Sequence, residues 1–312
     1  MIDPQGPSGG GGLGEIPYLR LPQPEALFAR RAARFAALAP GDTLSDYLEL
    51  LAKMAGAQEA ACAARRDIAG TARREPVSAR GEPVEPRPPL DVTTHRRDAR
   101  WREALGVIVS KLSAADTPSE TRRALERLAT AAPDTIELLA DRVLANAAEG
   151  SDLAAGPFVA AALQVYFTGL AALITPADVP RARRGCPMCG SLPVVGVVLG
   201  DDRLRYLVCS VCGTQWHRTR IQCTACGESK DLAYYRLEGE RAASVSTASA
   251  LKAEACPTCK AYTKLFYVER DPRLEPFADD MATLALDLLM AENGWARHGV
   301  NLFLIPANDL NR

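Results

Sequence analysis

The fold is decided by the stretch Cys209-Ser-Val-Cys-Gly-Thr-Gln-Trp-His-Arg-Thr-Arg-Ile-Gln-Cys-Thr-Ala-Cys226, in which ten residues separate two Cys-x-x-Cys pairs. The four thiols either close on one metal ion or belong to two sites. After Gly213 the intervening residues include no proline, asparagine, aspartate or further glycine, so nothing marks a chain reversal. Their β-branched and aromatic content favours a strand from Thr214 to Gln222, which would extend about 30 Å at roughly 3.3 Å per residue. We therefore expect the two pairs to serve different ions.

A further Cys-x-x-Cys pair precedes this stretch, and the sequence between them has the pattern of a β-hairpin. Residues 193–199 are rich in valine, Gly200-Asp201-Asp202 supplies turn chemistry, and residues 203–208 alternate apolar with polar. A hairpin brings its two ends together, so Cys189 and Cys209 should meet. Four thiolates can then surround one ion in a tetrahedron.

The last pair repeats this design. Residues 232–237 favour a strand, Glu238-Gly-Glu240 a turn, and residues 244–255 lead back to the fourth pair. We predict a first site formed by Cys186, Cys189, Cys209 and Cys212, and a second formed by Cys223, Cys226, Cys256 and Cys259. The alternative is an interleaved cross-brace, which joins the first pair to the third and the second to the fourth.

Metal binding is the favoured role of these cysteines. The sequence does not begin with a basic segment followed by an apolar one, so we expect a cytoplasmic chain whose thiols stay reduced. Four thiolates suit zinc or iron equally by geometry. The Cys-Pro-x-Cys motifs at 186 and 256 resemble rubredoxin knuckles, so two iron ions are a candidate occupancy beside zinc. Such sites keep no open coordination position, which argues against hydrolysis by a Lewis acid.

The rest of the chain divides around this region. We expect a flexible tail over residues 1–19 and an α-helical domain over 20–180, interrupted by a proline-rich connector at 76–89. Two ribbon modules, 181–222 and 223–270, should follow. Residues 271–312 should form a C-terminal helix, whose apolar face includes Leu274 and Leu288, and a tail. The predicted class is therefore α+β: a helical N-terminal domain, two tandem rubredoxin-like or zinc-ribbon modules and a C-terminal helix.

One segment is apolar enough to cross a membrane. Residues 156–174 carry no charge over 19 positions. They include Pro157, Gln164 and Thr168, are rich in alanine, and have no flanking basic cluster. We favour a buried core helix over membrane insertion.

The remaining candidate residues have simpler readings. Cys62 lies in an alanine-rich helical setting, where a buried structural thiol is the default. His217 could replace a metal ligand, although a place on the strand surface is favoured, and His95 and His298 belong to no recognisable motif. Asp279 and Asp280 either complement a helix dipole or contact a partner. We find no catalytic triad, phosphate loop or deaminase signature, and so no catalytic or organic-cofactor residues.

Charge gives one alternative function. The whole chain is nearly neutral, with 37 Lys and Arg against 38 Asp and Glu, yet residues 181–230 are locally basic. The basic residues are Arg181, Arg183, Arg184, Arg203, Arg205, Arg218, Arg220 and Lys230, and Tyr206 and Trp216 lie among them. A zinc-ribbon nucleic-acid-binding protein is therefore the alternative reading, and a solvated face or protein-docking patch explains the cluster equally well. An oxidoreductase that shuttles electrons is a weaker third reading.

Several motifs together carry a family resemblance. These are Cys186-Pro-Met-Cys-Gly-Ser-Leu-Pro193, Leu204-Arg-Tyr-Leu-Val-Cys-Ser-Val-Cys-Gly-Thr-Gln-Trp-His217, Asp271-Pro-Arg-Leu-Glu-Pro-Phe-Ala-Asp-Asp280 and Gly41-Asp-Thr-Leu-Ser-Asp-Tyr-Leu48. They resemble the formate dehydrogenase accessory protein family, FdhE. The sequence departs from the family pattern at Gln215, where an acidic residue is common, and in a longer proline-rich connector.

The resemblance implies a function without catalysis. It implies a cytoplasmic maturation factor that binds the catalytic subunit of respiratory formate dehydrogenases and supports formation of the active enzyme. It also implies iron, bound in a rubredoxin-like way by the eight cysteines. The sequence leaves the oligomeric state open, including a homodimer.

Overall fold

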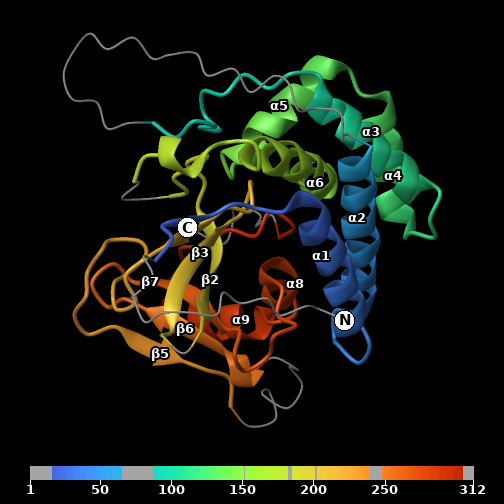
Figure 1. The fold of residues 1–312 in the computed structure, drawn as a ribbon. Helices are drawn as coiled ribbons and strands as arrows, with labels where there is room; N and C mark the ends of the chain where they lie inside the picture. Colours follow the sequence, from blue (N-terminus) through green and yellow to red (C-terminus); the bar gives the residue numbers. More distant parts are fainter. Residues whose placement is uncertain are drawn as a thin grey trace, which may run out of the picture.

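The computed structural model describes residues 16–64, 87–150, 152–181, 185–200, 202–238 and 248–304. Several predicted features fall outside these ranges: most of the flexible tail, most of the proline-rich connector, Arg183, Arg184 and the turn at 239–240. Within the described residues the chain forms a helical part and a mixed β-sheet, with two short helices between them (Figure 1). The predicted α+β class is confirmed.

The helical part is arranged around one central helix. Its elements are α1 (Pro24–Leu38), α2 (Ser45–Ala63), α3 (Arg100–Ser113), α4 (Ser119–Thr130), α5 (Pro133–Leu144), α6 (Asp152–Ala171) and the short 3₁₀ helix η1 (Pro176–Asp178). Helix α6 contacts α1, α2, α3, α4 and α5, which explains why apolar residues lie all round it. It is long and apolar enough to cross a membrane, and 78% of its most apolar window is buried inside the structure. The segment is a core helix, as predicted.

The strands of the described residues form one sheet of eight, not two separate ribbons. They are β1 (Leu19–Arg20), β2 (Pro193–Leu199), β3 (Leu204–Cys209), β4 (Gln215–His217), β5 (Ala233–Tyr235), β6 (Leu251–Ala255), β7 (Ala261–Tyr267) and β8 (Ala296–Arg297). A 3₁₀ turn, η2 (Ala248–Ala250), precedes β6. The order is β1-β4-β3-β2-β7-β6-β5, and β8 pairs with β7. Leu19 pairs with Trp216, so this end of the predicted tail over residues 1–19 is part of the sheet.

The two ribbons join through the parallel pair β2 and β7. Gly196 lies opposite Leu265 and Val197 opposite Phe266. A Cβ at Gly196 would lie 2.6 Å from Leu265 Cδ2, so any larger residue there would require the Leu265 side chain to shift. The two ribbons therefore share one hydrophobic layer and are fixed relative to each other.

The strand predicted from Thr214 to Gln222 is shorter than expected. It ends at His217, because the chain then bends around the buried guanidinium of Arg205. Arg205 Nη2 donates to the carbonyls of Thr219 and Gln222, and Arg205 Nη1 lies 2.5 Å from Glu254 Oε1. The two cysteine pairs are thus separated by a bend as well as by a strand.

The predicted C-terminal helix is two helices, α8 (Pro276–Met281) and α9 (Leu284–Glu292). Leu274 precedes α8, and Leu288 is 66% exposed, so the predicted continuous apolar face is wrong. The break occurs where a buried ammonium attracts backbone carbonyls: Lys264 Nζ donates to Asp280 O at 3.0 Å and to Thr283 O at 3.1 Å. These carbonyls are diverted from a regular helix.

Helix α8 packs against α1 through buried charges. Arg34 Nη2 lies 2.6 Å from Asp279 Oδ1, and Arg31 Nε lies 3.2 Å from Glu275 Oε1. The Arg31 guanidinium also stacks on the Phe277 ring at 3.8 Å. The C-terminal helices therefore connect the sheet with the helical part, and Figure 1 shows them between the two.

Candidate metal centres

The four Cys-x-x-Cys loops share one backbone conformation. In each loop the amide N–H of the first cysteine donates to the carbonyl five residues later. The bonds are Cys186 N to Ser191 O (2.8 Å), Cys209 N to Thr214 O (3.0 Å), Cys223 N to Glu228 O (2.6 Å) and Cys256 N to Ala261 O (2.9 Å). A repeated motif in the sequence thus becomes a repeated knuckle in the structure.

The residue after the second cysteine has a positive φ in every knuckle. The values are +81° at Gly190, +69° at Gly213, +83° at Gly227 and +58° at Lys260. Glycine adopts this conformation without strain, which explains its recurrence. Lys260 is the exception, and its ammonium lies 5.2 Å from the centre of the Trp295 ring. A cation–π contact therefore accompanies the strained backbone.

The first group of sulfurs is enclosed. It contains Cys186, Cys189, Cys209 and Cys212, whose Sγ atoms all lie within 4.8 Å of one another and whose side chains are 0% exposed. The closest sulfur–sulfur distances are 3.4 Å, from Cys189 to Cys209, and 3.6 Å, from Cys186 to Cys212. The amides of Val211 and Cys212 both point at Cys209 Sγ, at 3.4 Å. We name this group site one.

Two other parts of the chain cover site one. The backbone amides of Leu90 and Val92 donate to Met188 O (2.9 Å) and Cys189 O (3.0 Å) in the first knuckle. In the second knuckle Ser210 O accepts a hydrogen bond of 2.8 Å from Gln164 Nε2 on α6. Site one is therefore tied to the core of the helical part.

The second group of sulfurs is more open. It contains Cys223, Cys226, Cys256 and Cys259, also within 4.8 Å of one another. The closest distances are 3.6 Å, from Cys223 to Cys259, and 3.7 Å, from Cys226 to Cys256. Cys223 and Cys256 are buried, whereas Cys226 is exposed and Cys259 is partly exposed. We name this group site two.

Both groups fit a tetrahedral ion. A tetrahedron with metal–sulfur bonds of about 2.3 Å has sulfur–sulfur edges of about 3.8 Å, close to the separations in both sites. Disulfide bonds would need about 2.05 Å, and the thiols are free. The donor set, four thiolates per site, suits zinc or iron. The grouping is the consecutive one, not the interleaved cross-brace.

In the fourth knuckle, backbone amides favour a thiolate at Cys256. Burial alone raises the pKa of the Cys256 thiol, but the N–H groups of Cys259 and Thr258 point at its sulfur and lower that pKa to about 7. Amides directed at sulfur also orient ligands in thiolate sites. Burial outweighs the amides at the other two thiols of this site whose pKa values shift: the pKa of Cys223 is raised, and that of Cys259 is raised to about 12.

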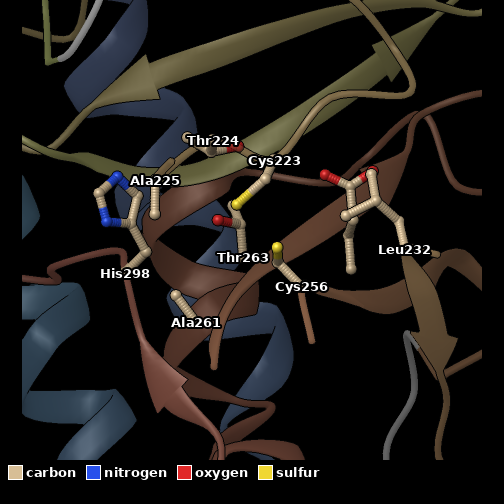
Figure 2. Close-up of a pocket in the computed structure, with 9 residues that line it drawn as sticks. Cys223, Thr224, Ala225, Leu232, Cys256, Ala261, Thr263 and His298 are labelled. Carbon is tan, nitrogen blue, oxygen red and sulfur yellow. The ribbon is translucent and has the colours of Figure 1, made fainter. Parts of the chain in front are cut away.

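A small pocket borders site two (Figure 2). It lies beside Cys223 and Cys256, whose sulfurs point towards one another, and His298 lies on the far side of Ala225. His298 belongs to neither sulfur group. His217 is also outside both groups; its ring lies 5.6 Å from the Tyr206 ring, and burial lowers its pKa.

The remaining sequence candidates have structural surroundings. His95 Nε2 lies 3.2 Å from Tyr166 Oη. Asp279 and Asp280 are both 0% exposed, so the alternative of a partner contact is wrong; Asp280 pairs with Lys264 at 3.1 Å. Cys62 is half-buried at the edge of a cavity of about 610 Å³ between α1, α3 and α6. No pattern in the sequence indicated this cavity.

The basic cluster loses its aromatic partners. Tyr206 and Trp216 are each 2% exposed, and Arg205 is fully buried against Glu254. Bases stack on exposed aromatic rings, which these two side chains do not offer. The combination of basic and aromatic residues therefore gives less support to nucleic-acid binding than the sequence alone indicated.

Comparison with known proteins shows to which family the chain is related. Three family models match successive parts of the chain: "FdhE, N-terminal" over residues 16–183, "FdhE, central domain" over 185–220 and "FdhE, C-terminal domain" over 221–304. The chain belongs to the FdhE family. It is 38% identical over 301 residues to the "Protein FdhE homolog" of Cronobacter sakazakii, covering 93% of this chain and 92% of the relative. The "Protein FdhE" of Salmonella enteritidis matches with the same identity and coverage.

A solved FdhE structure shares the fold. The crystal structure of the FdhE protein from Pseudomonas aeruginosa matches with a TM-score of 0.77 and 33% sequence identity, covering 94% of this chain and 100% of that one. The two tetra-cysteine sites therefore lie within an FdhE fold.

Sequence reasoning missed the polar network behind site one. Gln164 Oε1 accepts from Arg31 Nη1 at 2.9 Å and from Gln58 Nε2 at 3.0 Å. The two glutamines and the arginine are each no more than 1% exposed. Gln164 within an uncharged segment was the available signal, since a buried polar side chain needs partners.

Proposed function

We propose that the chain is an accessory protein for formate dehydrogenase, which binds the catalytic subunit in the cytoplasm before export and supports formation of the active enzyme. Membership of the FdhE family is the observation that carries this proposal. The motifs that carry the resemblance include the four knuckles and the segment Asp271–Asp280, which belongs to the joint between sheet and helical part.

The proposed role is not catalytic. At each site four sulfurs converge on one centre, so an ion held there has its coordination filled by protein ligands. Zinc enzymes keep one position for water or substrate, which these donor sets do not. The geometry supports a structural, redox-sensing or metal-carrying role over hydrolysis.

We propose that the eight cysteines bind two ions, iron in the first instance, with zinc as the alternative. The Cys-Pro-x-Cys knuckles at 186 and 256 motivate iron. In this proposal thiolate-bound iron reports or adjusts the redox state of the metal centres of the client enzyme. Protein purified from its own host without added metal should show ferric thiolate absorption. Zinc alone, without that absorption, would contradict the redox role.

A genetic experiment tests the proposal. Removing the gene should abolish respiratory formate dehydrogenase activity while the catalytic subunit is still synthesised, and the wild-type gene should restore it. Another exported respiratory enzyme serves as the control. Full formate dehydrogenase activity in the deleted strain would overturn the proposal. A homodimer remains part of the proposal and is tested by light scattering of the purified protein.

A further inference from the structure

The two sulfur groups differ in their access to solvent. All four cysteines of site one are 0% exposed. In site two Cys226 is exposed and Cys259 is partly exposed, while Cys223 and Cys256 are 5% and 1% exposed. The exposed residue Cys226 is therefore the side from which an incoming thiol or chelator would approach site two. Site one offers no sulfur to solvent.

The two groups also differ in what holds their knuckles. The knuckles of site one receive hydrogen bonds from Leu90, Val92 and Gln164, which belong to the helical part of the chain. Opening site one therefore requires separation of the helical part from the sheet.

Site two is held more locally. Gln222 Nε2 donates to Gly227 O at 3.1 Å, and the fourth knuckle is held by the amide of Ala296, which donates to Lys260 O at 2.8 Å. The nearby strand β5 lies at the edge of the sheet. Local opening requires less free energy where few buried contacts must break. The Cys226 knuckle can thus open while the rest of the fold persists.

We propose that the two sites have different roles: site one is a permanent structural site, and site two exchanges its ion with external soft ligands. The inference rests on the proposed metal binding and extends it, because it assigns the exchangeable role to Cys223, Cys226, Cys256 and Cys259. The ion would be a soft divalent cation, zinc or ferrous iron.

The exchange is a substitution of one ligand by another, so it requires no oxidant or reductant. Cys226 would give up its bond first, because it is the exposed residue of the four, and a thiolate or nitrogen of the acceptor would take its place. The other three cysteines then release the ion, whose charge does not change. The freed thiolates take up protons from water as their pKa values require. The reverse order loads the site.

A chelator experiment tests the inference. Protein reconstituted with zinc, two ions per chain, is mixed with a coloured zinc chelator at neutral pH, and release is followed with time. We expect two phases of equal amplitude, the slow one more than about tenfold slower. Alkylation with N-ethylmaleimide and mass spectrometry during the fast phase should find Cys226 and Cys259 modified before Cys186 and Cys189.

Matched variants assign the phases. Cys226→Ser should remove the fast phase and leave one slowly released zinc with an unchanged far-UV circular dichroism spectrum. Cys189→Ser, at the equivalent position of site one, should instead reduce thermal stability. Release in a single phase, or alkylation of site one before site two, would overturn the inference. Equally slow release of both ions would overturn the inference but not the proposed binding of formate dehydrogenase. That binding is measured separately by capture of the catalytic subunit.

Discussion

Gln164 is the side chain whose loss should separate the helical part from site one. It is 1% exposed; its amide nitrogen donates to Ser210 O at 2.8 Å, and its amide oxygen accepts from Arg31 Nη1 at 2.9 Å. In Gln164→Leu one buried carbonyl and one guanidinium N–H lose these partners. Each such group costs about 1–3 kcal/mol, so the free energy of unfolding should fall by about 2–6 kcal/mol.

Gln58→Leu is the matched control. Gln58 is equally buried, and its amide nitrogen donates to Gln164 Oε1 and to Ala161 O, each at 3.0 Å, but its own amide oxygen has no hydrogen-bond partner among the described residues. Ala161 lies inside α6, where its carbonyl also accepts from the helix backbone. Its replacement removes an unsatisfied acceptor, while Gln164 keeps the bond from Arg31. The loss should therefore stay below about 1 kcal/mol.

Urea unfolding of the zinc-loaded proteins compares the two variants. Circular dichroism and tryptophan fluorescence follow the same transition, and the midpoint and slope give the free energy of unfolding. The Gln164→Leu protein should also release the zinc of site one faster than the wild type. Equal losses in the two variants, or a Gln164→Leu protein as stable as the wild type, would refute the assignment of Gln164 as the link.

Three further perturbations follow from the structure. Gly227→Ala places a side chain at φ +83° and should cost about 1–2 kcal/mol in thermal unfolding; an unchanged Tm would contradict the knuckle geometry. Lys260→Gly should change stability by less than about 1 kcal/mol, because relief of strain offsets the lost contact with Trp295; a large loss would be unexpected. The hydrogen bond from Arg142 lowers the pKa of Asp152 in the folded state, so its stabilisation exists above about pH 4 and disappears as the pH falls through the lowered pKa. Urea titrations should therefore show that the free energies of unfolding of the wild type and of Asp152→Asn converge as the pH falls. A difference in free energy that does not change with pH would contradict this.

The two hairpins were predictable because their information is local. Turn residues, alternation and the spacing between cysteine pairs determine which ends meet, and the sulfurs group as that spacing predicts. The core role of residues 156–174 was predictable for the same reason, since polar side chains and alanine content distinguish them from a membrane segment.

The remaining features depend on contacts between distant residues. The parallel pairing of β2 with β7 joins Gly196 to Leu265, which no local pattern encodes. Buried charges also override propensity. Arg205 ends the strand at His217, and Lys264 divides the final helix, because each draws backbone carbonyls to itself. Patterns within one segment of the sequence do not indicate which distant residue a buried charge will contact.

The most direct test of the account is capture of this protein from extracts of its own host under conditions that express respiratory formate dehydrogenase. We predict that the catalytic subunit copurifies in stoichiometric amount, and that replacement of all four cysteines of site one by serine reduces that amount. Recovery of the chain without any formate dehydrogenase subunit among its stoichiometric partners would contradict the account.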